Sequence, residues 1–152
     1  MDESNKRIPT AEVLVELMSA ESFQEFYAEN VDLLQLPALT EYLADLCREK
    51  DILPNKLFHD IDIEKSLGNK ILSGSRRLSR DNALKIALGL KMGFKEAQRL
   101  LSISKNSLLY PFIPRDAAII YCLHNKTGYL ETQNNLFEWG MMVLGDSKSH
   151  EK

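Results

Sequence analysis

The chain has 152 residues, of which 44% are hydrophobic and 27% are charged, and this composition is ordinary for a globular protein with one core. It contains no apolar run near the roughly 20 residues that a membrane-spanning helix needs, and its first ten residues, MDESNKRIPT, are too polar for a secretory signal. We therefore expect a cytoplasmic protein without a membrane segment. Cys47 and Cys122 stand alone on helical patterns, so we expect two buried, reduced thiols rather than a disulfide or a metal site.

The net charge of −3 is unevenly distributed along the chain. Residues 64–105 contain ten Lys or Arg and three acidic residues, which gives +7, so the remaining residues carry −10. Residues 1–51 alone hold twelve acidic residues against four basic ones. A segregated basic block is the electrostatic footprint of a surface that faces phosphates, and a solvated basic face without a partner is the alternative.

The sequence of residues 1–36 predicts an acidic N-terminal arm with two short amphipathic helices, which are acidic on the outside and apolar on the inside. Ser22 is placed to cap the second of them. The apolar residues of the arm are Val13, Leu14, Leu17, Met18, Phe23, Phe26 and Tyr27. Helices this short do not persist alone in water, so they must dock on another surface. They either cover the core of their own domain or serve a partner-binding or dimerising role, and the sequence leaves both open.

Residues 37–105 predict five helices with short connections. Two of the helix starts carry Pro37 and Pro54, whose missing N–H costs no hydrogen bond in a first turn, and Gly74 is placed to end a helix in the left-handed conformation. Asp62 tolerates the same conformation in the turn between the second and third helices. The expected helices run from Pro37 to about Lys50, from Pro54 for about two turns, from about Glu64 to Leu72, from Arg80 to Leu90 behind a Ser79 cap, and from Phe94 to Ile103.

Residues 106–144 predict a C-terminal helical extension, and residues 145–152 a frayed polar tail. An apolar crossing over 108–114 precedes a helix from Asp116 to His124, and Gly128 separates it from a last helix that ends near Trp139. Nothing alternates at the period of a strand, so the fold class is predicted as all-α. No catalytic triad, phosphate loop or ligand-like histidine spacing is present, so we expect neither an enzyme nor a bound cofactor or metal.

The stretch I-E-K-S-L-G-N-K-I-L-S-G-S-R-R-L-S-R-D, residues 63–81, resembles the phage-repressor type of helix-turn-helix regulator, the XRE family. The likeness is closest to such regulators of Gram-positive bacteria, continues into LLYPFIPRDAAII and covers roughly residues 39 to 140. It implies a lambda-repressor-like five-helix DNA-binding domain whose second motif helix lies in the major groove. In that orientation Lys65, Ser66, Asn69 and Lys70 would face the groove, while Arg76, Arg77 and Arg80 would grip the DNA backbone.

Three residues depart from the family pattern. Phe58 and Gly68 stand where a small residue and a bulky aliphatic residue are usual, and we expect the large ring of Phe58 to fill the space that Gly68 leaves. Asp62 replaces a usual glycine. Glu64 is unfavourable beside phosphates, and we expect it to cap the helix and compensate its dipole.

These features predict a sequence-specific DNA-binding transcriptional regulator that binds double-stranded DNA as a homodimer. The alternative is a protein-interaction module, adaptor-like or antitoxin-like, on a helix-turn-helix scaffold. It rests on the acidic N-terminal arm, which could hold a protein partner, together with Gly68 and Glu64.

Overall fold

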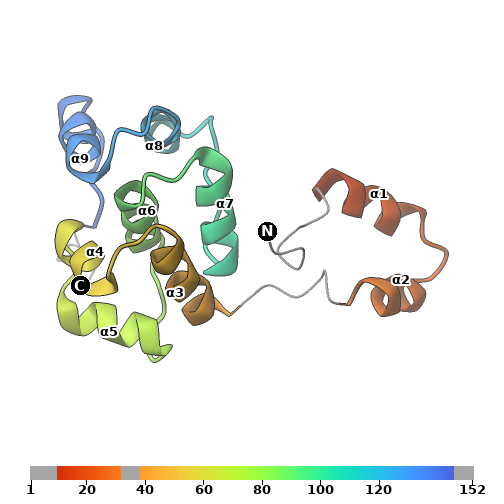
Figure 1. Cartoon of the computed structure of the whole chain (residues 1–152). Coiled ribbons are helices and arrows are strands. Elements are labelled where there is room, and N and C mark those ends of the chain that lie inside the picture. Colours follow the sequence, from red (N-terminus) through yellow and green to blue (C-terminus); the bar gives the residue numbers. More distant parts are fainter. Residues whose placement is uncertain (1–9, 32–37, 146–152) are drawn as a thin grey trace. The chain divides into compact units, whose positions relative to one another are not determined.

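The computed structural model describes residues 10–31 and 38–145, and within these residues the chain forms helices and no strands (Figure 1). The prediction of an all-α chain is therefore confirmed for the described part. The chain divides into two compact units, Met1–Pro37 and Ala38–Lys152. None of the described helices is long and apolar enough to cross a membrane.

The described part of the first unit consists of α1 (Thr10–Ser19) and α2 (Phe23–Asn30). Ser22 caps α2 as predicted, because its hydroxyl accepts a 3.1 Å hydrogen bond from the backbone N–H of Glu25. Within this unit, the apolar faces of the two helices are not buried against each other. Phe26 is the only buried residue among positions 11–31, and most other large apolar side chains of the two helices are exposed. Two helices of ten and eight residues are too small to enclose a core of their own.

The second unit contains seven helices among its described residues, and most of their limits lie within about two residues of those expected from sequence. They are α3 (Leu39–Glu49), α4 (Pro54–Asp60), α5 (Lys65–Ser73), α6 (Arg80–Gly89), α7 (Phe94–Ile103), α8 (Pro114–His124) and α9 (Tyr129–Glu138). The predicted start of α3 at Pro37 and the predicted frayed tail beyond residue 145 lie outside the described residues. Gly74 ends α5 in the left-handed conformation with a φ of 85°, and Ser79 caps α6 through the N–H of Asn82, both as predicted.

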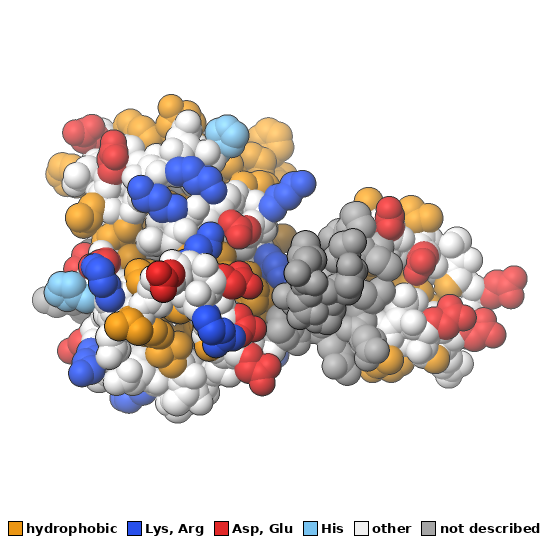
Figure 2. Space-filling model, in the orientation of Figure 1, with side chains coloured by type: hydrophobic (Ala, Val, Ile, Leu, Met, Phe, Trp, Pro, Cys, Tyr) orange, Lys and Arg blue, Asp and Glu red, His pale blue; other side chains and the backbone are white. Residues whose placement is uncertain are grey.

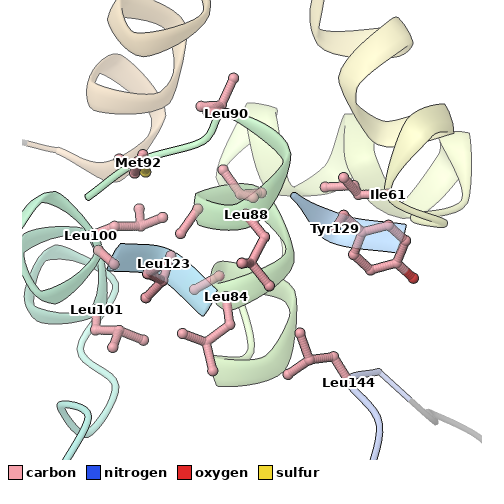
Figure 3. Close-up of a cluster of buried hydrophobic side chains, with 14 of the residues drawn as sticks. Ile61, Leu84, Leu88, Leu90, Met92, Leu100, Leu101, Leu123, Tyr129 and Leu144 are labelled. Carbon is pink, nitrogen blue, oxygen red and sulfur yellow. The ribbon is translucent and has the colours of Figure 1, made fainter. Parts of the chain in front are cut away.

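Helix α6 is the centre of this unit, because it packs against α4, α7 and α9 (Figure 1). Its apolar side chains, including Leu84 and Leu88, lie among residues that precede α6 in the chain, such as Ile61, and residues that follow it, such as Leu123 (Figure 3). Cys47 and Cys122 are buried and free of disulfides, as expected.

The C-terminal helices share this core rather than standing apart as an extension. Ile119 on α8, Leu136 on α9 and Leu144 after it are all at most 2% exposed, and they belong to the same cluster as the residues of α3 to α7. Two polar ties reinforce this packing. Arg115 at the start of α8 forms a two-pronged salt bridge with Asp81 on α6, and Asp81 also accepts a hydrogen bond from the N–H of Gly145. Residues 106–145 therefore help to hold α6 in place.

Candidate nucleic-acid interface

Helices α4 and α5 form a tight pair joined by a short turn. Asp62 adopts the left-handed conformation in this turn with a φ of 60°, as its residue type allows. The residues on either side of it, Ile61 and Ile63, are 0% and 4% exposed and fix the turn to the core. The N–H of Ile63 donates to the carbonyl of Phe58, which closes the turn on the end of α4.

The Phe58 ring fills the space that Gly68 leaves on α5. A Cβ placed on Gly68 would lie 2.4 Å from Cδ2 of that ring, far inside the ordinary 3.5 to 4.0 Å contact of two carbon atoms. Phe58 is 2% exposed. The prediction that these two positions meet is confirmed, and the absent side chain at 68 sets how closely α5 approaches α4.

The outward face of α5 carries the four residues for which the sequence predicted a role in the groove. Lys65, Ser66, Asn69 and Lys70 are all exposed. Gly68 and Ile71 are buried on the opposite side of the helix, which fixes its rotation about its axis. The orientation of α5 thus matches the expected one, while contact with a base remains a prediction.

Glu64 occupies the N-cap position of α5, but its side chain makes no capping hydrogen bond with the helix. The expectation of a side-chain cap is therefore wrong. Instead, the carboxylate lies 3.4 Å from the hydroxyl of Ser66, which donates to it. The negative charge still lies at the positive end of the helix dipole, where it is favourable.

The loop after α5 brings further basic residues to the C-terminal end of that helix. The N–H groups of Ser75 and Arg76 both donate to the carbonyl of Lys70. The guanidinium of Arg77 donates to the carbonyl of Lys105, which follows α7, over 3.1 Å. Arg76, Arg77 and Lys105 are exposed, so they continue the surface that begins at Lys70.

We call this surface the basic face, made up of Lys65, Lys70, Arg76, Arg77 and Lys105. Among the described residues, none of these five forms a salt bridge, so their charges remain open to an anionic partner. Lys105 belongs to the basic block of residues 64–105, but it was not among the predicted DNA-binding residues. Its link to Arg77 spans 28 residues, and no local signal in the sequence marks it.

Arg80 does not join the basic face. Its guanidinium forms a two-pronged salt bridge with Asp116, and the same group donates to the carbonyls of Ser107 and Leu108. Asp116 is 2% exposed, so Arg80 neutralises a buried carboxylate and ties α6 to the start of α8. Because its donors are directed into the protein, we leave Arg80 out of the candidate interface.

A second cluster of polar groups supports the turn from behind. The hydroxyl of Tyr129 on α9 donates to the carboxylate of Asp62 over 3.0 Å, and the ammonium of Lys85 on α6 donates to the carbonyl of Asp62 over 3.2 Å. Burial, together with the hydrogen bond to Asp62, raises the pKa of Tyr129 to about 12. Burial lowers the pKa of Lys85. Lys85 therefore belongs to the interior and, like Arg80, contributes nothing to an outer basic surface.

Comparison with known protein families, with curated proteins and with solved structures found no match for this chain.

Proposed function

We propose that this chain is a DNA-binding transcriptional regulator that inserts α5 into the major groove of double-stranded DNA, with α3 to α7 serving as a lambda-repressor-like domain of the XRE type. The observation that carries the proposal is the position of uncharged and basic side chains on one helix. Ser66 and Asn69 lie on the outward face of α5, and the basic face frames them at both ends of that helix.

The two groups of residues have different tasks in this proposal. The exposed amide of Asn69 suits the paired donor and acceptor of an adenine edge, and Lys65 and Lys70 suit guanine or phosphate. Arg76, Arg77 and Lys105 neutralise phosphates and thereby set the position of α5. A homodimer places two such helices about one DNA turn apart, as a palindromic site requires.

Protein binding by the same scaffold is the second candidate. Its supporting observation is Glu64, whose exposed carboxylate lies beside Lys65 and Ser66 at the start of α5, where DNA phosphates would repel it. This candidate predicts that mutation of α5 affects a protein complex rather than DNA binding.

The salt dependence of duplex binding tests the DNA proposal. Each neutralised phosphate contributes about 0.9 to the slope of log affinity against log salt concentration. The double variant Arg76→Ala with Arg77→Ala should therefore flatten the slope by about two and weaken specific and random duplexes alike.

A matched pair of basic residues provides the control. Lys91 lies in the turn before α7 and Lys95 in its first turn, whereas Lys105 follows the other end of this ten-residue helix, which is about 15 Å long. Lys91→Asn with Lys95→Ala should leave the slope unchanged, and asparagine is chosen because position 91 has a positive φ of 54°. Equal slopes for the wild type and the Arg76/Arg77 variant would remove these arginines from the proposal.

A further inference from the structure

The described N-terminal residues carry charge of one sign only. Residues 10–31 contain five glutamates and no Lys or Arg, a charge of −5, whereas residues 38–145 contain fifteen basic and twelve acidic residues, a charge of +3. On the face of residues 10–31 that Figure 2 shows, acidic and apolar side chains occur without a basic one. The glutamates are Glu12, Glu16, Glu21, Glu25 and Glu29. The charge of residues 10–31 therefore favours a partner that brings positive charge.

Each of the two helices also presents an apolar pair to solvent. Leu14 and Met18 on α1 are 46% and 80% exposed, and Phe23 and Tyr27 on α2 are 64% and 46% exposed. The members of each pair are four residues apart and so lie on one face of their helix. Single exposed apolar residues are common, but these four, together with the exposed Val15 and Leu17 on α1, mark an interaction surface.

The acidic residues occupy a different side of each helix from these pairs. In α1 and in α2, a glutamate lies two positions from each member of the apolar pair, which is about 200° around the helix. Four of the glutamates line a shallow hollow of about 400 Å³ whose floor includes the buried ring of Phe26. They are Glu16, Glu21, Glu25 and Glu29. The unit thus offers carboxylates around a hollow and apolar side chains outside it.

We infer that α1 and α2 form a docking surface for a protein segment that carries Arg or Lys beside apolar side chains. Its cations enter the acidic hollow and its apolar residues cover the exposed pairs. Its positive charge distinguishes this partner from a second copy of these helices, from nucleic acid and from an anionic membrane. A second copy of residues 10–31 would bring −5 against −5, and nucleic acid or an anionic membrane would be repelled in the same way. The inference does not depend on DNA binding.

A labelled synthetic helix tests the inference on the full chain. The probe is a 14-residue peptide with leucine at helical spacing and arginine on both flanks, and fluorescence anisotropy reports its binding. Two matched peptides replace every arginine by glutamate or every leucine by serine. We expect binding of the first peptide and at least about tenfold weaker binding of both others, a difference that corresponds to about 1.4 kcal/mol.

Variants of the chain locate the binding. Leu14→Ser with Met18→Ser removes one apolar pair, and Glu16→Gln with Glu25→Gln removes two charges while keeping side chains that suit a helix. Each double variant should weaken the probe roughly tenfold.

The control uses exposed apolar and acidic residues on α9, where Leu130 and Phe137 are exposed beside Glu131 and Glu138. Leu130→Ser with Phe137→Ser, and Glu131→Gln with Glu138→Gln, should leave the affinity unchanged. Equal losses in the α9 variants, or losses from the charge variants alone, would show unspecific attraction and overturn the inference. So would an absence of probe binding, or sedimentation showing self-association that the Leu14/Met18 variant abolishes.

Discussion

Gly68→Ala should lower the free energy of unfolding, although replacing glycine by alanine within a helix usually raises it. In an ordinary exposed helix, replacing glycine by alanine stabilises by about 1 kcal/mol. Here the added Cβ would lie 2.4, 2.7 and 2.9 Å from three atoms of the Phe58 ring, so the ring must move by about 1 Å to restore normal contact. Overpacking of a filled core costs roughly 1 to 3 kcal/mol, which equals or exceeds the gain. We expect the free energy of unfolding to fall by up to about 2 kcal/mol.

A double-mutant cycle isolates the contact. Phe58→Ala removes all three clashing ring atoms and, because Phe58 is buried, should itself cost about 3 to 5 kcal/mol. In that background Gly68→Ala should stabilise by about 1 kcal/mol, since only the helical preference remains. The sign of one substitution thus reverses with the identity of residue 58. Urea denaturation followed by circular dichroism measures the four free energies of unfolding, and equal effects of Gly68→Ala in both backgrounds would refute the packing argument.

Two further predictions concern the polar ties. Arg80→Ala leaves the buried carboxylate of Asp116 without its cation and should lower the free energy of unfolding by about 3 to 5 kcal/mol, whereas the exposed Arg76→Ala should change it by less than about 0.5 kcal/mol in the same denaturation assay. If Arg80→Ala changed the free energy of unfolding as little as Arg76→Ala does, the salt bridge to Asp116 would contribute little to stability. Tyr129 has a pKa of about 12 in the fold against an ordinary value of 10.0, so the unfolded chain loses this proton first and the stability that Tyr129 contributes is lost as pH rises from 10 to 12. Tyr129→Phe should remove this part of the pH dependence, and identical pH profiles for variant and wild type would contradict the assignment.

Local signals explain why the helices were predictable. Pro54, Gly74 and Ser79 mark helix ends through their own backbone or side-chain chemistry, and the structure places each in that role. The outward face of α5 was implied by the family resemblance, and the burial of Gly68 and Ile71 agrees with that orientation.

Long-range partners explain what the sequence could not show. Arg80 resembles its neighbours Arg76 and Arg77, and only the salt bridge to Asp116, 36 residues away, removes it from the candidate interface. The helical pattern of Leu14 and Met18 identifies an apolar face, but it does not say whether the same chain covers it.

Selection of binding sites from a random duplex pool tests sequence-specific DNA binding most directly. Asn69 is the uncharged residue of the α5 face whose amide can pair with an adenine edge, so it should carry sequence information that phosphate contacts lack. The wild type should yield a shared, roughly palindromic motif. Asn69→Ala should blur that motif at one symmetric position and cost about 1 to 3 kcal/mol on the preferred site, with much less effect on random DNA. A pool that yields no motif with the wild-type chain, at a salt concentration where it binds duplex DNA, would contradict the proposed readout by α5.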